Sequence, residues 1–535
     1  MSLLIYYLLV FVFSCLPLIS FFSTNLLPHT HDGLVHLARM AAYYKALGDG
    51  QFPVRWAGDL NYGYGLPLFN FMYHTPYLIS SLFLSLGVSL VMTFKLVISI
   101  SYILAGVFMY LFAKSFFKNE KTAFLVAVFY QFAPFRLVEL LIRGSYGELY
   151  TYTLLPLVLY GLTKFFSERH VRYFILTAMA AGLLILSHNS ISLMFFGILV
   201  FFIAIFSPNK RTLLLCYLAI FLGLLFSAFY WLPALFEHRY TYGDLFMKDL
   251  FRAHFPPMYQ LVLPNLFNNP LLQTGGIPVQ IGFFHVLALF ASVLVRKKLA
   301  IFCLVITDIA VFFMTKLSLP LWEHISFLRQ FQFSWRLLAL VNFASAMAAA
   351  SFFQLSIFKK QWLYPLLIIF VIATTAFYWS PRLGFDKITD EGQFWNYPLN
   401  TTYFGETDVI WSAGPAQRYP KAMAEVIDGI ATLSNFSKKT QTHGYSVSAQ
   451  TDIRLVDHTQ YFPGWRVYVD GTKIPIQFQD ANWRGQLTFA VPKGEHGVRV
   501  SFEETPVRLA ANIVSLMSLG VLSLSFLFWH NKKIS

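Results

Sequence analysis

A short polar stretch follows the first apolar segment of the chain and holds the residues best suited to acid–base chemistry. It reads Pro-His-Thr-His-Asp-Gly-Leu-Val-His over residues 28–36. If a helix starts at Asp32, then His36 and Arg39 follow at i+4 and i+7 and share its face. That face could hold a general base, a second acid–base group in His36 or His31, and a cation beside an anionic substrate.

The same carboxylate also fits a structural interpretation. Aspartate is a favoured N-cap residue, so Asp32 could simply start the helix. The apolar residues that would form the buried stripe of that helix are Leu34, Leu37, Ala38 and Ala41. Capping and catalysis can coincide in one residue, and the stretch alone leaves both interpretations equally open.

The composition places this stretch in a membrane protein. Of the 535 residues 57% are hydrophobic and 12% are charged, and apolar runs of the roughly 20 residues needed to cross a bilayer recur along the chain. A soluble enzyme is therefore excluded. The net charge of +14 fits cytoplasmic loops and contact with anionic membrane lipids or phosphate, and we expect no nucleic-acid partner. Cys15, Cys216 and Cys303 all fall in apolar segments and predict no disulfide or zinc site.

The positions of the basic residues predict the topology. Counting the apolar segments in order places every basic cluster and both termini in the cytoplasm, which predicts a multi-pass protein of the plasma (inner) membrane with a retained first span. The twelve predicted transmembrane helices lie near residues 3–22, 93–113, 120–138, 148–166, 171–187, 190–206, 212–232, 279–295, 299–315, 333–357, 361–380 and 507–529.

One further apolar stretch conflicts with the rule that every basic cluster lies in the cytoplasm. Counting residues 76–92 as a span would move Lys114, Lys118 and Lys121 outside. We therefore predict a re-entrant or interfacial helix within a first outer loop of residues 23–92. A thirteenth crossing is the alternative.

The pattern changes over residues 381–505, which we call the outer domain. Short alternating segments replace the long apolar runs, and Asp470-Gly471 between two of them is a strong hairpin signal. This predicts an extracytoplasmic β-sandwich-like domain. The chain then divides into a transmembrane domain of residues 1–380, the outer domain, and a final helix with a cytoplasmic tail over 506–535.

Further polar clusters lie at the outer ends of the predicted spans. Arg136, Glu139 and Arg143 have i, i+3, i+7 spacing, and Glu148 follows. Two arginines to one glutamate would leave a cation free for a phosphate, although a mutually paired cluster is also a common structural device. The other candidates for contact with a substrate or carrier, for which capping or an aromatic belt is the structural alternative, are His188, Glu237, Trp335 and Arg336.

Two features of the sequence bear on what could supply the energy for a reaction or for transport. Asp308 is the one carboxylate near mid-membrane, where it could serve a proton relay or bond to a neighbouring helix. No Walker loop, dinucleotide glycine fingerprint, HExxH motif or nucleophile elbow is recognisable. An activated, lipid-linked substrate fits the absence of a nucleotide motif.

The order of these parts resembles the C-type, polyprenyl-phosphate-dependent glycosyltransferases. More closely, the chain resembles the bacterial membrane family labelled "6-pyruvoyl-tetrahydropterin synthase-related", a label that says nothing useful about pterins. The stretches that carry the resemblance are 31–33 with His36, 55–56 with 63–67, 134–136 with Arg143, Gly144 and Glu148, 229–233 with Glu237, and 332–336.

The resemblance implies a membrane glycosyltransferase that moves a sugar from a polyprenyl-phosphate carrier to an extracytoplasmic glycan or lipid acceptor, in the synthesis of envelope polysaccharide or glycolipid. Asp32 would be the base or a metal-associated residue. Many such enzymes have a second acid beside the first, and here His31 or His36 would take its place, so a divalent metal is possible but not implied.

The remaining residues receive binding roles in this hypothesis. Arg136, Arg143 and Arg336 would hold the carrier phosphate. The aromatic residues expected to stack on the sugar or the isoprenoid are Trp56, Tyr64 and Trp335. A lipid or polysaccharide transporter and a non-catalytic envelope-assembly protein are the alternatives.

Overall fold

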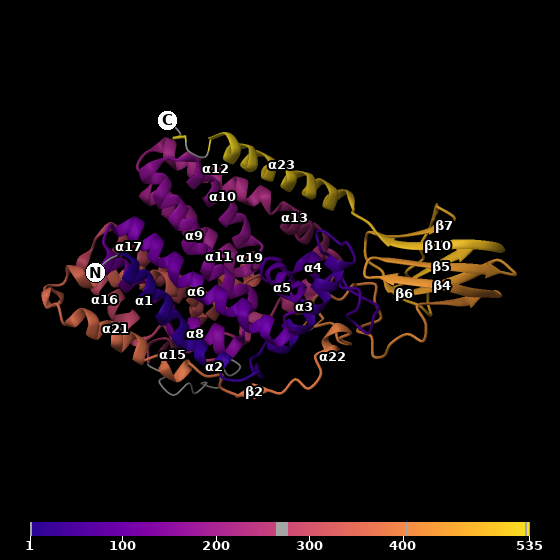
Figure 1. The fold of residues 1–535 in the computed structure, drawn as a ribbon, viewed down its shortest axis with the longest axis horizontal. Helices are drawn as coiled ribbons and strands as arrows, with labels where there is room; N and C mark the ends of the chain where they lie inside the picture. The colour runs from indigo at the N-terminus through magenta and orange to yellow at the C-terminus, as the bar shows by residue number, and fades with distance from the viewer. Residues whose placement is uncertain (1–2, 264–276, 403–404, 530–531, 534–535) are drawn as a thin grey trace.

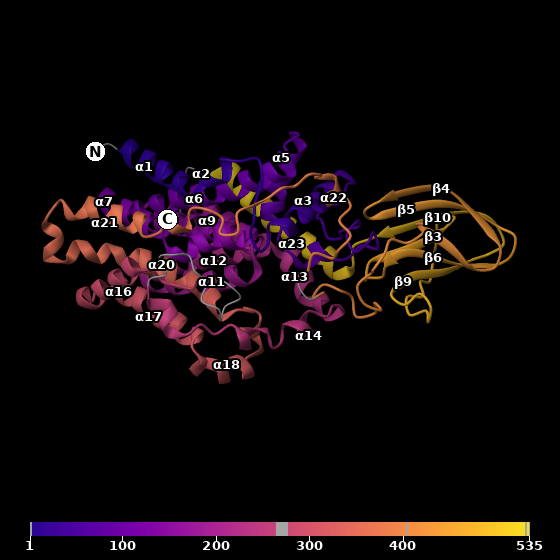
Figure 2. The same ribbon diagram turned by 90° about the horizontal axis from the view of Figure 1, so that it is seen from below.

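A bundle of helices and a pair of β-sheets make up the computed structural model, which describes residues 3–263, 277–402, 405–529 and 532–533. The sheets pack against one end of the bundle, and α23 (Pro506–Trp529) runs back from them along the helices (Figure 1). The start of α1 (Leu3–Cys15) and the end of α23 both lie at the opposite end of the bundle (Figures 1 and 2). Residues 264–276, between the predicted spans 212–232 and 279–295, lie outside the described residues.

Each of the twelve predicted apolar segments contains a helix. Besides α1 and α23, the main helices of these segments are α6 (Leu90–Phe117), α7 (Glu120–Gln131), α9 (Tyr146–Glu168), α10 (Val171–Ile185), α11 (Asn189–Phe206), α12 (Lys210–Phe226), α13 (Ala228–Glu237), α16 (Phe283–Val295), α17 (Lys298–Met314), α20 (Leu338–Ala348) and α21 (Leu363–Ala373). The shorter ones include α2 (Ile19–Phe22), α4 (Leu68–Phe71), α8 (Pro134–Val138), the π-helical turn η2 (Glu139–Arg143), α14 (Gly243–Met247), α15 (Met258–Val262), α18 (Leu319–His324), α19 (Ser326–Arg329) and α22 (Gly392–Trp395).

The number of spans is smaller by length and composition than the sequence predicts. Five of the described helical segments are long and apolar enough to cross a membrane, or eight if each of three bent pairs counts as one span. Helices α10 and α16 are apolar but shorter than a bilayer core. The chain is thus a membrane protein with several apolar helices, and twelve spans stay a prediction.

The stretch 76–92 forms a short helix followed by a turn. Helix α5 (Thr75–Ser85) has 11 residues, and Gly87, with a φ of +80°, separates it from α6. At 1.5 Å per residue this helix is about 16 Å long, which is roughly half of a ~30 Å hydrocarbon core. Its length fits a re-entrant or interfacial helix better than a thirteenth crossing.

The side on which Lys118 lies tests this topology. Lys118 is exposed just after α6, and we expect it in the cytoplasm. In a variant without the three native cysteines, Lys118→Cys should stay unlabelled by a membrane-impermeant maleimide in intact cells and become labelled after permeabilisation. Lys473→Cys, exposed in the outer domain, should label in intact cells. Ready labelling of residue 118 from outside would overturn the twelve-span topology.

Residues 424–502 of the outer domain form two antiparallel sheets (Figure 2). The strands of the larger sheet, in spatial order, are β4 (Ala431–Lys439), β5 (Thr442–Ala449), β10 (Gly494–Phe502), β7 (Trp465–Val469) and β8 (Thr472–Ile474). Those of the smaller sheet are β3 (Ala424–Asp428), β6 (Ile453–Gln460) and β9 (Gln486–Val491). The predicted hairpin is present, with Asp470 and Gly471 at positive φ between the paired Val469 and Thr472.

The first outer loop completes the core of this domain. Trp56 is 1% exposed, and its ring lies 5.3 Å from that of Trp465 and 5.2 Å from that of Phe502. The Thr440 N–H also donates to the Asp49 carboxylate. The loop and the domain therefore lie on the same side of the membrane. Trp56 was expected to stack on a sugar, and that expectation is wrong because the domain core covers its faces.

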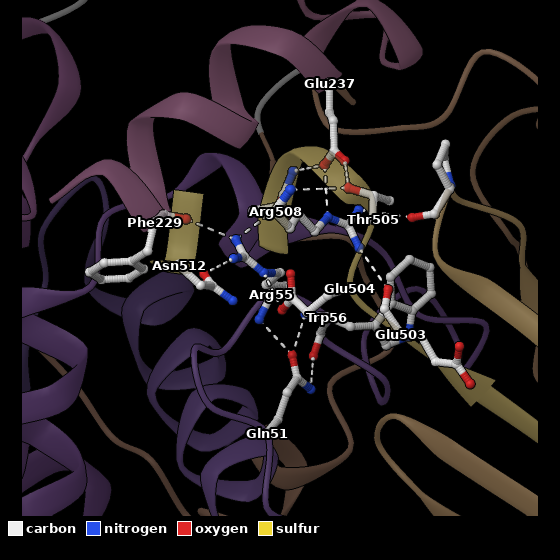
Figure 3. A network of polar contacts seen from close by, with 12 residues as sticks. Gln51, Arg55, Trp56, Phe229, Glu237, Glu503, Glu504, Thr505, Arg508 and Asn512 are labelled. Atoms are coloured by element: carbon white, nitrogen blue, oxygen red, sulfur yellow. Dashed lines mark hydrogen bonds and ion pairs between the residues drawn. The ribbon is translucent and has the colours of Figure 1, made fainter. Parts of the chain in front are cut away.

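A buried network of ion pairs joins this loop, the outer domain and the last helix (Figure 3). Arg55 donates to Glu504 at 2.9 Å and to Asn512 at 2.9 Å on α23. Glu237 accepts from Arg508 at 2.9 Å and from Thr505 at 2.8 Å. Glu237, a candidate substrate contact in the sequence, thus fastens α13 to α23.

Removing Glu237 should destabilise the protein strongly. The guanidinium of Arg508 is fully buried, and Glu237→Ala would leave it without its counter-charge, at a cost of roughly 3–5 kcal/mol. The melting temperature in detergent measures this. Glu323→Ala, which breaks a more exposed pair with Arg252, should cost about 1 kcal/mol or less. Equal melting temperatures for the two variants would show that the network does not stabilise the contact between the first outer loop, the outer domain and α23.

Candidate active site

Asp32 lies at the start of α3 (Gly33–Gly48), where the loop turns into helix. Its N–H donates to the carbonyl of Arg143, and the N–H of His31 donates to that of Ile142, both at 3.0 Å. The half-buried Asp32 side chain makes no capping hydrogen bond. It therefore occupies the N-cap position without capping, and its carboxylate accepts no hydrogen bond from any residue that the structure describes.

Two glycines allow this close approach of the loop to the bundle. Gly144 has a φ of +64°, and a Cβ there would lie 2.3 Å from Thr30 Oγ1. A Cβ on Gly147 would lie 2.4 Å from the carbonyl oxygen of Ser187 and 2.5 Å from the ring of Tyr73. Glycine at both positions brings the loop, η2 and the start of α9 into contact.

Two arginines and two glutamates form a buried cluster directly beside Asp32. Arg143 Nη1 lies 2.6 and 2.7 Å from the two oxygens of Glu139 and 2.9 Å from Glu148 Oε2. Arg336 Nε donates to Glu148 Oε1 at 3.1 Å, and His188 Nε2 lies 3.6 Å from the same oxygen. The cluster therefore balances two cations with two anions, in place of the surplus cation that the sequence spacing suggested.

Aromatic rings support both guanidinium groups and leave part of each available. Arg143 lies over the ring of Trp335 at 4.9 Å, and Arg336 lies over that of Phe333 at 4.7 Å. Neither Nη2 atom bonds a described residue, so each arginine keeps a donor for a further anion. Trp335 is 1% exposed, which means that it orients Arg143 and cannot stack on a sugar as expected.

Arg136 lies apart from this cluster. It is fully buried, with the rings of Tyr102, Tyr130 and Tyr152 at 5.2, 4.8 and 4.7 Å. The predicted shared face assumed α-helical spacing, but the chain changes from α8 to a π-helical turn after Val138. Arg136 was expected to hold the carrier phosphate, and its enclosed position contradicts that role.

His36 lies one turn deeper than Asp32 rather than beside it. Its Nδ1 is 2.9 Å from the hydroxyl of Tyr77, and its ring stacks on Tyr146 at 4.9 Å. Burial, with the nearby charges of Arg39 and Arg143, lowers the pKa of His36 well below its ordinary value. It is therefore a neutral, positioned imidazole, whereas His31 is exposed next to Asp32.

The sequence analysis did not identify a pair of tyrosines, Tyr73 and Tyr77, that lie beside His36 and His188. The rings of Tyr73 and Tyr77 stack at 5.6 Å, and Tyr73 also contacts the ring of His188. Burial raises the pKa of both hydroxyls, and the charges of Asp32 and Arg39 act on them. Their i, i+4 spacing at the start of the predicted re-entrant helix was the available signal.

Two further residues from the sequence lie away from the cluster. Tyr64 contacts His458 of the outer domain. Asp308 is exposed on α17 and bonds no residue that the structure describes, so of its two alternatives the bond to a neighbouring helix is absent there. Within the described ranges, no group of three or more His, Cys, Asp or Glu side chains is placed to hold a metal ion.

Comparison with known proteins adds a family and a group of structures. A family model described as "6-pyruvoyl-tetrahydropterin synthase related domain; membrane protein" matches residues 69–382. No curated protein in the comparison matches the chain.

Three solved structures that resemble the chain are of the arabinofuranosyltransferase AftD from mycobacteria, two of them classes of one mutant. Their sequence identities are 16%, 18% and 18%, with TM-scores of 0.43, 0.44 and 0.45. The matches cover 71%, 71% and 73% of this chain but only 27%, 28% and 29% of those chains. This chain thus spans less than a third of their length.

Proposed function

The chain belongs to the 6-pyruvoyl-tetrahydropterin synthase related family of membrane proteins, and from that premise we propose that it is a glycosyltransferase. It moves a sugar from a polyprenyl-phosphate carrier to a glycan or lipid acceptor on the outer side of the plasma membrane. The observation that supports this most directly is the free carboxylate of Asp32 beside Arg143, which shares a buried cluster with Arg336, each arginine with an unused donor.

The proposed reaction is a displacement at the anomeric carbon of the donor sugar. The acceptor hydroxyl oxygen attacks that carbon while Asp32 takes the hydroxyl proton. The bond from the anomeric carbon to the phosphate oxygen breaks, and its electron pair leaves with the polyprenyl phosphate. Arg143 and Arg336 stabilise the charge that develops on this phosphate. His31, exposed and directly before Asp32, shares the proton.

The balanced charge of the cluster suits this role. Glu139 and Glu148 hold the guanidinium groups in place and offset their charge, so the cluster does not bind every phosphate strongly. The interaction grows as the phosphate gains charge, which is the condition for lowering a barrier rather than merely binding a substrate. No step of the proposal involves a metal.

Transfer in proteoliposomes tests the proposal. Purified full-length protein is supplied with lipid-linked sugars extracted from host membranes, together with envelope glycan or glycolipid as acceptor. We expect sugar to appear on the acceptor and free polyprenyl phosphate to form in equal amount. Release of neither product from any extracted donor would overturn the proposal.

A further inference from the structure

Three rings meet on the smaller sheet of the outer domain, and we call Tyr64, His458 and Trp483 the ring platform. The edge of the Tyr64 ring lies against His458 at 5.9 Å, and Trp483 lies against it at 5.5 Å. They come from the first outer loop, from β6 and from the segment before β9. A single surface thus combines two parts of the chain nearly 400 residues apart.

Hydrogen bonds fix the central ring and leave neighbouring polar atoms unused. His458 Nε2 lies 3.0 Å from Glu425 Oε1, and Nδ1 lies 2.6 Å from Gln486 Oε1. The second oxygen of Glu425, the amide nitrogen of Gln486, the Tyr64 hydroxyl and the indole N–H of Trp483 bond no residue among those described. Each strand of the smaller sheet contributes one of these side chains or the imidazole itself.

The exposure of the outer rings separates the platform from the domain core. Trp56 and Trp465 are at most 1% exposed, whereas Tyr64 and Trp483 are half-buried. Burial raises the pKa of the Tyr64 hydroxyl, while Arg418 lowers it and Glu425 raises it, so charges of both signs adjoin the platform. Packing alone does not account for half-exposed aromatic rings with free polar tips.

This combination matches the chemistry of a saccharide. Sugar rings offer C–H faces that pack on aromatic rings, and hydroxyl groups that both donate to a carboxylate and accept from an amide, an indole or a phenol. Arg484 follows Trp483, and Arg418 also adjoins the platform, but the Glu425 carboxylate on the same surface would repel the phosphates of a nucleic acid or of an anionic membrane.

We propose that the ring platform binds a neutral saccharide chain and holds a part of the acceptor glycan remote from the site of transfer. This assignment of the acceptor rests on the proposed function. Asp32 starts α3, and the first outer loop continues from the other end of that helix, which is about 24 Å long for its 16 residues. In this proposal an acceptor of several sugar units contacts both places.

Direct binding to the full-length protein in lipid nanodiscs tests the platform. The probes are neutral hexasaccharides of hexopyranose, hexofuranose and pentofuranose units, and isothermal titration gives Kd for each. We expect at least one to bind, and Trp483→Ala and Tyr64→Ala each to raise its Kd about tenfold or more. Phe436→Ala is the matched control, because it removes an exposed aromatic residue from the larger sheet and should leave Kd unchanged.

Two outcomes would overturn the proposal that the ring platform binds a saccharide. One is the absence of binding by every hexasaccharide, and the other is binding that neither platform variant weakens. The melting temperature of each variant shows whether it folds, and Trp483→Tyr, which keeps a ring and a polar tip, should restore most of the affinity. Asp32→Asn should bind saccharide like the wild type. If binding holds while no variant or wild-type protein transfers sugar, the proposed function fails and saccharide binding stands.

Discussion

Asp32→Asn should reduce sugar transfer by about 10²–10⁴-fold, the usual contribution of a general base, without lowering the melting temperature. Asparagine has nearly the same shape but cannot take the proton from the acceptor hydroxyl. The folded state loses no hydrogen bond at the start of α3 by the change, because the Asp32 carboxylate makes no capping hydrogen bond. Transfer by the purified variant in proteoliposomes, measured at saturating donor, gives the effect on the chemical step.

Asp386→Asn is the matched control for this experiment. Asp386 is a second carboxylate close to the same loop, but it is bonded to His29 at 2.7 Å, and its strand β2 (Phe385–Asp386) pairs with β1 (Leu27–Pro28). We expect this variant to retain transfer. Binding of the lipid-linked donor should survive in Asp32→Asn, since the two arginines are unchanged. Near-wild-type transfer by Asp32→Asn would remove the base from the proposed reaction.

Arg143→Lys should lower kcat about 100-fold, which is typical for the loss of one donor to the charge that develops in a transition state. Lysine keeps a positive charge between Glu139 and Glu148, but its single ammonium group cannot bond both carboxylates and a phosphate in the planar arrangement of a guanidinium. It also loses the flat contact with Trp335. Release of polyprenyl phosphate from a limiting amount of donor measures the defect.

Two other substitutions distinguish this effect from damage to the fold. Arg143→Ala leaves two buried carboxylates without their nearest cation and should destabilise the protein by roughly 3–5 kcal/mol. Arg136→Lys makes the same chemical change at an arginine outside the cluster, so the folded protein should keep its kcat. A wild-type kcat for Arg143→Lys, or an equal loss for Arg136→Lys, would contradict the assignment of the phosphate to Arg143.

Local patterns in the sequence predicted much of the architecture. Apolar runs located the helices, the change to short alternating segments located the sheets, and Asp470-Gly471 identified its hairpin. The conflict between residues 76–92 and the basic clusters singled out the short helix α5. Asp32 was singled out as a candidate by its neighbours, since a polar run after an apolar segment is costly unless the fold uses it.

What the sequence could not predict depends on contacts between distant residues or on small departures from regular geometry. Arg55 and Glu504 are 449 positions apart, and no local spacing pairs them. The π-helical turn η2 removes Arg136 from the cluster, although α-helical periodicity places it there. An arginine that finds its carboxylate on another helix looks the same in sequence as one left free for a ligand.

The position of Trp56 in the core of the outer domain also has a consequence for biogenesis. The ribosome delivers the first outer loop long before β3, which begins at Ala424, so the large indole of Trp56 has no partner to cover it until the strands of the outer domain are made. The apolar side chain of Trp56 stays exposed until the last strands are synthesised. A chain whose synthesis stops earlier would expose this apolar surface to proteases and chaperones. Closure of the outer domain around Trp56 is therefore a late step of folding, because the core that covers this indole needs Trp465 and Phe502 from near the end of the chain.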